Sequence, residues 1–304
     1  MDQNSVVIIT GASSGIGKAT AAALAERQAH IVMLCKDSER GMAALKDVKR
    51  SSCNQNVILM LCDLGSRKSI ELFCAAFRSR FSRLDVLINN AGVALFARQE
   101  TTDGFEMHFG VNYLGSFILT NLLLDLLIDS APSRIINVSS NTHANGTIHF
   151  DDINLKKKFR PWRAYEQSKL AEILFTYTLA ERLRGTGVTA NCLHPGAVGT
   201  QIGVVRNKNA IKAIRKIVSP FFLTAEKGAE TAVYLAVSPN VTNTTGAYFV
   251  RKRARRSSKL SYNRVIAERL WSLSEKMTGI CGYRAAPDQV CCKRSHGILP
   301  DEPL

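Results

Sequence analysis

The sequence lacks any apolar run long enough to cross a membrane. A membrane helix needs about 20 consecutive apolar residues, and the strongest candidate, residues 117–128, is interrupted by Asn121 and Asp125. The chain also has no room for a secretory signal, because the first strand-like run begins at Ser5. We therefore predict neither a membrane helix nor a cleaved leader.

Cysteine and histidine are present, but their spacing is not that of a metal site or a disulfide framework. The eight Cys and six His are scattered, and Cys such as Cys35 and Cys62 lie in apolar strand-like runs. A thiol in such a run behaves as a small hydrophobic side chain. We expect no bound metal and a reducing, cytoplasmic location.

Acidic residues are scarce compared with basic ones. There are 25 Asp and Glu against 40 Lys and Arg, which gives a net charge of +15. Part of the excess is local, at residues 156–158 and 251–259. Such runs are usually solvated surface, but they also suit anionic lipid, nucleic acid or a phosphorylated cofactor. We expect no nucleic-acid partner and keep open a peripheral contact with an anionic membrane.

Short apolar runs alternate with helix-patterned segments, which is typical of a parallel sheet with helices on both faces. The apolar runs are continuous, as expected for strands covered on both faces. We predict one α/β domain over residues 1–280, a Rossmann-type doubly wound sheet of about seven strands. The expected strands are 6–10, 30–35, 56–62, 84–89, 133–139, 188–193 and 246–249. The expected helices are 15–27, 38–49, 66–80, 102–128, 162–184 and 224–237.

A glycine-rich turn joins the first strand to the first helix, at residues 10–17 (Thr-Gly-Ala-Ser-Ser-Gly-Ile-Gly). Gly11 allows the tight turn, and Gly15 and Gly17 let backbone approach a pyrophosphate at the helix N-terminus. The motif predicts a nucleotide-containing cofactor. By itself it does not distinguish a nicotinamide from a flavin or a simple nucleotide.

Tyr165 and Lys169 are four residues apart in a segment rich in helix formers. They therefore share one helix face. An ammonium beside a phenol favours the phenolate, which makes the pair a candidate acid/base. Tyr248 and Lys252 have the same spacing, but they lie in a strand-like run where such neighbours do not face each other. We interpret that second pair as a coincidence.

Together with Ser140 and the Asn-Asn-Ala-Gly run at 89–92, these motifs resemble the short-chain dehydrogenase/reductase family over residues 5–280. The glycine spacing resembles the compact single-domain branch, which disfavours an epimerase or dehydratase. Within the family the chain is most similar to the retinol-dehydrogenase-like group. The segment Trp-Ser-Leu-Ser-Glu-Lys-Met-Thr-Gly at 271–279 and the long loop 141–161 carry that similarity.

The resemblance implies four catalytic residues. Tyr165 would be the general acid/base, and Lys169 would lower its pKa and bind the nicotinamide ribose. Ser140 would hold the substrate oxygen, with Ser139 as the competing candidate. Asn112 would anchor a water that relays protons to Lys169.

The resemblance also implies a nicotinamide dinucleotide. Asn90 would stabilise the sheet beside it, and Asp63 would contact the adenine unless it belongs to the N-cap region of the next helix. Pro195, Gly196 and Thr200 would cover the nicotinamide. The implied cofactor-binding residues are Gly11, Ser13, Ser14, Gly15, Ile16, Gly17, Lys36, Asp63, Leu64, Asn90, Ala91, Gly92, Tyr165, Lys169, Pro195, Gly196, Val198 and Thr200.

The end of the second strand distinguishes the two nicotinamide cofactors, because an acid there binds the ribose 2′-hydroxyl and repels a 2′-phosphate. We align Cys35 with that position. Lys36, helped by Lys18 or Arg40, then offers a cation to the phosphate, which favours NADP(H) over NAD(H). The competing alignment places Asp37 on the ribose and favours NAD(H).

The sequence thus predicts an NADP(H)-dependent oxidoreductase that interconverts an alcohol with an aldehyde or ketone. Residues 200–223 would form a basic amphipathic lid, which favours a lipophilic substrate of retinoid, steroid or fatty-aldehyde type and contact with anionic membrane. The alternative is a cofactor-binding regulator or scaffold that uses its basic surface to bind membrane or nucleic acid. The resemblance permits a homo-oligomer paired through 102–128 and 162–184, and 281–304 is expected to be a disordered tail.

Overall fold

The computed structural model describes residues 3–197 and 223–283. Eight strands form one sheet in the order β3-β2-β1-β4-β5-β6-β7-β8. All neighbours pair in parallel except β7 and β8, which are antiparallel. The strands are β1 (Val6–Thr10), β2 (His30–Cys35), β3 (Val57–Leu61), β4 (Val86–Asn89), β5 (Ser133–Val138), β6 (Val188–His194), β7 (Tyr248–Val250) and β8 (Arg253–Arg255). The predicted parallel-sheet α/β fold is confirmed.

The strand missing from the prediction is β8, which raises the number from about seven to eight. It consists of Arg253, Ala254 and Arg255, and all three are exposed. Its backbone pairs with β7, so Phe249 lies opposite Ala254. Charged edge strands of this kind discourage pairing with other chains. Because β8 has no apolar pattern, its basic residues resemble a surface loop in the sequence, and the strand was not predicted.

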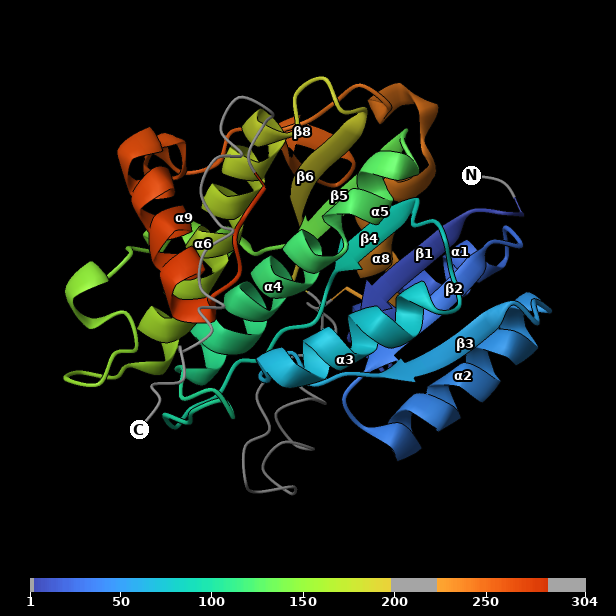
Figure 1. The fold of residues 1–304 in the computed structure, drawn as a ribbon, viewed down its shortest axis with the longest axis horizontal. Helices are drawn as coiled ribbons and strands as arrows, with labels where there is room; N and C mark the ends of the chain where they lie inside the picture. Colours follow the sequence, from blue (N-terminus) through green and yellow to red (C-terminus); the bar gives the residue numbers. More distant parts are fainter. Residues whose placement is uncertain (1–2, 198–222, 284–304) are drawn as a thin grey trace, which may run out of the picture.

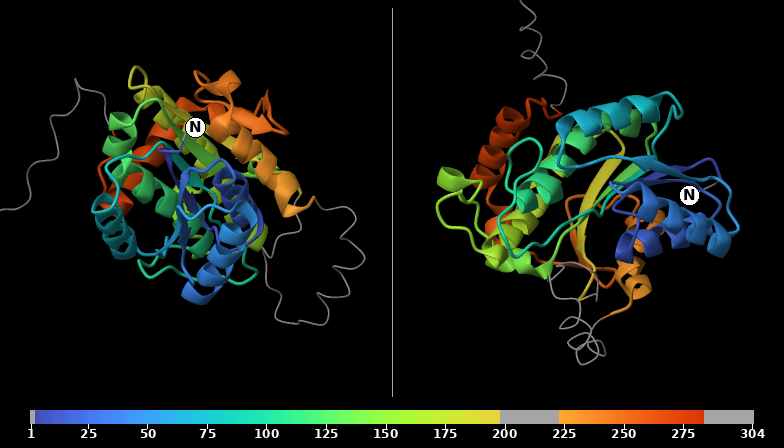
Figure 2. Two further views of the ribbon diagram at one scale, coloured as in Figure 1. Left: turned by 90° about the vertical axis from the view of Figure 1, so that its right-hand side faces the viewer. Right: turned by 90° about the horizontal axis from the view of Figure 1, so that it is seen from below.

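Two helical layers cover the sheet, as Figures 1 and 2 show. Successive side chains of β1 point to opposite faces of the sheet. Val6 and Ile8 belong to the core on one face, and Val7 and Ile9 belong to the core on the other. The first core packs under α3, α4, α5, α6 and α9, and the second under α1, α2 and α8. The helix bounds are α1 (Gly15–Ala25), α2 (Ser38–Ser52), α3 (Arg67–Arg78), α4 (Gly115–Leu122), α5 (Leu124–Asp129), α6 (Pro161–Arg182), α8 (Ala225–Val237) and α9 (Arg264–Thr278).

The helix predicted over 102–128 is wrong in detail. The chain forms a π-helical segment, η1 (Phe109–Leu114), which continues into α4, and a kink at Leu123 separates α4 from α5. At Gly115 a Cβ would lie 2.5 Å from the backbone oxygen of Leu64, so this glycine lets the helix approach the β3 end closely. π-Helical turns are frequent at functional sites, and this one carries Asn112.

Helix α9 was not predicted, although it ties the C-terminal part of the fold to the sheet-covering layer. Trp271 lies against the rings of Phe117 and Phe175, with centroids 5.2 and 5.7 Å away. The Ser274 hydroxyl is 2.7 Å from that of Tyr113. Residue 283 is anchored too, because its backbone N–H donates to Asn121 Oδ1 at 3.1 Å. The rest of the tail predicted at 281–304 lies outside the described residues.

Within the described ranges, no helix is long and apolar enough to span a membrane. In the same part of the chain, no three His, Cys, Asp or Glu side chains gather in a way that could hold a metal ion.

Candidate active site

The glycine-rich turn after β1 has the shape of an anion cradle. Gly11 and Gly15 have φ of +67° and +54°, the left-handed region that favours glycine. A Cβ at Gly17 would lie 2.5 Å from the Gly11 oxygen and would overlap the Asn90 amide. Ser14 precedes α1, but its side chain makes no capping hydrogen bond. The start of α1 thus suits a pyrophosphate, since its first N–H groups and its dipole favour an anion.

Asn90 ties the ends of β1 and β4 together beside this cradle. Its side-chain amide donates to the Thr10 carbonyl at 2.8 Å. The Thr10 hydroxyl in turn accepts the backbone N–H groups of Asn90 and Ala91 at 2.9 and 2.8 Å. The sequence places Asn90 at this sheet end, and the structure supplies the bonds that hold the two strand ends in register.

At the end of β2, Lys36 and Asp63 meet in an ion pair of 2.8 Å that the sequence did not suggest. The Lys36 side chain remains 71% exposed. Cys35 is buried, and burial raises the pKa of its thiol to about 11. Asp37, the rival ribose ligand, is the N-cap of α2 and accepts the Arg40 N–H at 2.8 Å.

The two candidate helpers of Lys36 differ in position. The Arg40 guanidinium reaches the Ser14 hydroxyl at 3.4 Å, at the edge of the cradle. Lys18 instead pairs with Asp47 at 2.6 Å. Asp63 is not the cap of the following helix, because Ser66 caps α3 by accepting the Ser69 N–H. Asp63 accepts the Gly65 N–H at 2.9 Å and leaves its second oxygen to Lys36.

Helix α6 carries Tyr165 and Lys169 on one face. The Lys169 ammonium lies 5.5 Å from the centre of the Tyr165 ring. Asn112 approaches the same helix from η1, donating to the Ser168 hydroxyl at 3.0 Å and accepting the Val93 N–H at 2.7 Å. A Cβ on Gly92 would lie 3.5 Å from both Asn112 Oδ1 and Lys169 Nζ. The Asn-Asn-Ala-Gly run, η1 and α6 therefore converge at one place.

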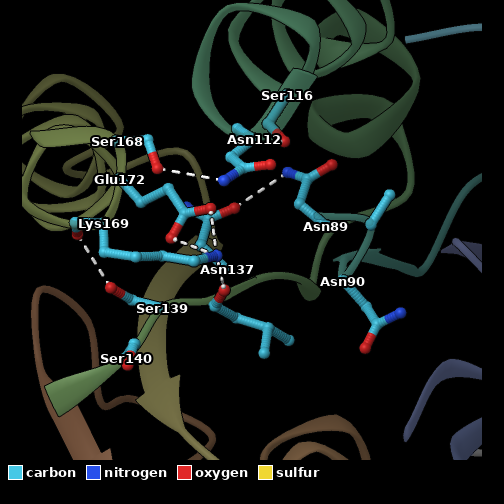
Figure 3. Close-up of polar contacts among 12 residues, drawn as sticks. Asn89, Asn90, Asn112, Ser116, Asn137, Ser139, Ser140, Ser168, Lys169 and Glu172 are labelled. Carbon is cyan, nitrogen blue, oxygen red and sulfur yellow. Dashed lines mark hydrogen bonds and ion pairs between the residues drawn. The ribbon is translucent and has the colours of Figure 1, made fainter. Parts of the chain in front are cut away.

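Ser139 and Ser140, the two candidates for the substrate oxygen, have different surroundings. Ser139 donates to the Lys169 carbonyl at 2.8 Å and is buried, and Figure 3 shows it directed at α6. Among the described residues, the Ser140 hydroxyl makes two long contacts of 3.3 Å, to the Asn141 side chain and from the Thr142 N–H. Because Ser139 is committed to the helix backbone, the Ser140 hydroxyl is the one better able to exchange its partner.

Sequence reasoning missed a buried acid beside Tyr165 and Lys169. The Glu172 carboxylate contacts Lys169 Nζ at 2.9 and 3.2 Å, and the same ammonium donates to the Val138 carbonyl at 3.0 Å (Figure 3). Glu172 and Lys169 are both 4% exposed. An acid three residues after Lys169 was the available signal, but charged residues on helices usually face water.

His108 and Glu106 were missed as well. The His108 ring stands edge-on to Tyr165, with centroids 6.3 Å apart. Its Nε2 accepts the Leu95 N–H at 2.8 Å, so its proton lies on Nδ1, which is 2.5 Å from Glu106 Oε1. Both side chains are buried. His108 thus fixes the chain after Gly92 and packs against the Tyr165 ring, and Glu106 holds the His108 ring in place.

The remaining predicted residues flank the end of β6. Gly196 has φ +91°, and a Cβ there would lie 2.5 Å from a Leu223 methyl group. The Ala197 carbonyl accepts the Leu223 N–H at 2.8 Å. Val198, Thr200 and the part of the expected lid that precedes Leu223 lie outside the described residues.

These groups gather at the carboxyl ends of parallel strands, where doubly wound sheets bind their ligands. The cradle follows β1, the Lys36–Asp63 pair lies at the ends of β2 and β3, and Ser140 and Lys169 lie beside β5. The set combines a site for a dinucleotide with a phenol, an ammonium and a hydroxyl. Such a site can move a proton to or from an oxygen next to a bound redox cofactor.

Comparison with known proteins agrees with this geometry. Residues 5–210 match the family model for short chain dehydrogenase. The chain is 42% identical over 275 residues to retinol dehydrogenase 12 of Mus musculus, covering 90% of this chain and 86% of the relative. An uncharacterized protein from Mycobacterium Paratuberculosis superposes with a TM-score of 0.73 at 33% identity, covering 92% and 94% of the two chains.

A second solved structure is an actinorhodin polyketide ketoreductase with NADPH. It superposes with a TM-score of 0.63 at 25% identity and covers 82% of this chain and 97% of that one. From these matches, the chain belongs to the short-chain dehydrogenase/reductase family and, within it, to the retinol-dehydrogenase-like group.

Proposed function

We propose that the protein is an NADP(H)-dependent oxidoreductase that interconverts an alcohol with an aldehyde or ketone on a lipophilic substrate of retinoid, steroid or fatty-aldehyde type. The observation that carries the proposal is the convergence of Tyr165, Lys169 and Asn112 beside the glycine cradle. The similarity to relatives named retinol dehydrogenase supports the substrate class.

When bound, the nicotinamide supplies or accepts the hydride. In the reducing direction, Tyr165 gives its phenolic proton to the substrate oxygen as negative charge develops there. The Ser140 hydroxyl donates to the same oxygen, and one such preorganised donor can contribute about 2.7–4 kcal/mol to the transition state. The Lys169 ammonium favours the phenolate that remains, and it would bind the ribose. Asn112 holds the loop after Gly92 against α6.

The direct test is consumption of NADPH or NADH with a panel of lipophilic aldehydes and ketones, together with the reverse reaction on the alcohols. We expect turnover that depends on the cofactor and is faster with NADPH. Tight cofactor binding without turnover of any carbonyl or alcohol would contradict the proposal. That outcome would favour a cofactor-binding regulator or scaffold.

Lys36 provides a separate test of cofactor choice. Lys36→Ala should weaken NADPH binding by about tenfold or more, because a hydrogen bond to a charged group is worth about 1.5–3 kcal/mol. It also leaves the Asp63 carboxylate without its partner, next to the expected 2′-phosphate. NADH binding should change little. Affinities for both nucleotides, measured by fluorescence titration, check this result.

Lys18→Ala is the matched control, since Lys18 is a cation near the cradle that pairs with Asp47 instead. A loss of NADH affinity as large as that of NADPH in Lys36→Ala would contradict the NADP(H) preference. It would favour Asp37 as the ribose ligand.

We also propose that the protein touches anionic membrane near the start of α6. A hollow of about 550 Å³ is lined there by Lys158, Arg160, Arg163 and Trp162, and Trp162 is 63% exposed. Tryptophan is enriched at membrane interfaces. Each basic residue near an anionic surface contributes about 1 kcal/mol of attraction.

Co-sedimentation with vesicles of mixed neutral and anionic lipid tests this contact. We expect binding at low salt that weakens at least about tenfold in Arg160→Glu/Arg163→Glu. Arg253→Glu/Arg255→Glu on the exposed β8 edge makes the same charge change elsewhere and should weaken binding less. No binding of the wild type at low salt, or an equal loss in both variants, would exclude this surface.

A further inference from the structure

Glu172 is a buried acid that the proposed chemistry does not yet use. It lies on the buried side of α6, 4% exposed, within one turn of Lys169. Both of its carboxylate oxygens contact the Lys169 ammonium, at 2.9 and 3.2 Å. Taking a carboxylate out of water costs several kcal/mol unless it is paired. Its presence beside a catalytic lysine therefore needs an explanation.

The surroundings of the pair come from three elements. From β5 and the residue after it, the Val138 carbonyl accepts from Lys169, and the Ser139 hydroxyl interacts with Glu172. From β6, the Cys192 thiol faces the carboxylate, and burial raises the pKa of that thiol strongly. From α6 itself, the Tyr165 side chain interacts with Lys169. Among the described residues, Lys169 is the cation in contact with Glu172.

Burial disfavours the charged form of Lys169. Desolvation would lower the pKa of Lys169, but the Glu172 charge and the Tyr165 side chain outweigh it, so the Lys169 pKa is raised. Conversely, burial raises the pKa of Glu172 to about 7 against the opposing effect of Lys169. Glu172 thus favours the protonated form of Lys169, and Lys169 offsets part of the effect of burial on the Glu172 pKa.

The loss of the charge would matter for the site. A neutral amine would no longer stabilise a phenolate at Tyr165, 5.5 Å from the ring centre. It would also bind the ribose hydroxyls less strongly, because charge-assisted hydrogen bonds are about twice as strong as neutral ones. The position of the ammonium depends on the same contacts, since Val138 and Glu172 hold it from two sides.

We propose that Glu172 is a positioning residue for this reaction, which keeps Lys169 protonated and holds its ammonium beside Tyr165, where it would bind the ribose. The inference rests on the proposed function, because it assigns Lys169 its ribose and Tyr165 partners. Glu172 touches Lys169 and not the reacting atoms. Its effect is therefore expected in how cofactor affinity and kcat depend on pH.

The opposite role is also testable. Three contacts engage the Lys169 ammonium, two to Glu172 and one to Val138. Glu172 could then compete with the dinucleotide for the ammonium, and its removal would tighten cofactor binding. The two roles predict changes of opposite sign.

The experiment is a titration of NADPH and NADH affinity between pH 5.5 and 9 in wild type and Glu172→Gln, which removes the charge but keeps the shape. We expect Glu172→Gln to bind NADPH about tenfold or more weakly at pH 8.5 and to recover toward pH 6, as solvent protons recharge Lys169. The kcat profile should shift to acid in parallel. Glu166→Gln, an acid on the same helix outside this pair, is the matched control and should keep the wild-type profile.

An unchanged profile in Glu172→Gln, or tighter binding at high pH, overturns the proposal. If this variant folds too poorly to titrate, Glu172→Asp takes its place. Its shorter carboxylate retreats from Lys169, so we expect a smaller acid shift, and an unchanged profile overturns the proposal there as well. Binding is measured without turnover. A failure of the proposed carbonyl chemistry would therefore appear as normal titrations with no product, distinct from a failure of the Glu172 assignment.

Discussion

Tyr165→Phe should lower turnover by about three to four orders of magnitude and leave cofactor affinity within about twofold of wild type. The substitution removes the hydroxyl that carries the transferred proton and keeps the ring that packs edge-on against His108. It leaves Lys169, Glu172 and the glycine cradle untouched. Single-turnover rates and NADPH titrations on the same preparation separate the two effects.

Tyr177→Phe is the control for this prediction. Tyr177 lies three turns further along α6, and its hydroxyl bonds to Ser257 at 2.7 Å, away from Lys169. It should keep nearly full turnover. Turnover within tenfold of wild type in Tyr165→Phe would show that another group supplies the proton, and the assignment of Tyr165 would have to be abandoned.

Lys169→Ala should lose both turnover and cofactor affinity, and it should also destabilise the fold by about 3–5 kcal/mol. The stability loss arises because the Glu172 carboxylate would remain buried without its cation. Activity assays, nucleotide titrations and urea denaturation at several pH values measure the three effects.

The stability loss has a defined pH dependence. The pKa of Glu172 is already raised from 4.5 to about 7 in the folded protein, so the folded state holds a proton that the unfolded state releases. Such a group contributes stability that is fully present below pH 4.5 and is lost as the pH rises through about 7. Without Lys169 the folded pKa of Glu172 rises further, so Lys169→Ala should be least stable relative to wild type at alkaline pH.

Adding Glu172→Gln to Lys169→Ala tests the origin of this loss. The double variant should regain part of the stability at alkaline pH, because the unpaired carboxylate is gone, but none of the turnover. If both variants lose the same stability at every pH, the unpaired Glu172 carboxylate is not the source of the loss. The loss would then be that of the lysine side chain packing alone.

Much of the fold could be predicted because its signals are local. The apolar runs predicted seven of the strands to within about two residues at either end, and the Thr-Gly-x-x-x-Gly-x-Gly turn indicated the β1–α1 junction. The misses are elements whose sequence pattern is ambiguous. A π-helical segment has the same composition as an α-helix, and a three-residue arginine strand resembles a surface loop.

The residues of the candidate site were proposed from signals of the same local kind. Tyr165, Lys169, Ser140 and Asn112 lie in recognisable motifs, and the structure brings the helix, η1 and the strand end together. Glu172 and His108 carry no motif. Their importance comes from burial and from partners that the sequence does not identify as neighbours, such as Val138 and Leu95.

The sequence by itself determined the order of elements, the glycine cradle and the shared face of Tyr165 and Lys169, since each depends on residues within a few positions of one another. Only the tertiary structure decided which charges meet. Packing of β5 and β6 against α6 removes water from Glu172 and Lys169, and the side-by-side ends of β2 and β3 bring Lys36 to Asp63. Which charged groups meet, and how strongly they interact, depends on burial and geometry, which are properties of the folded chain.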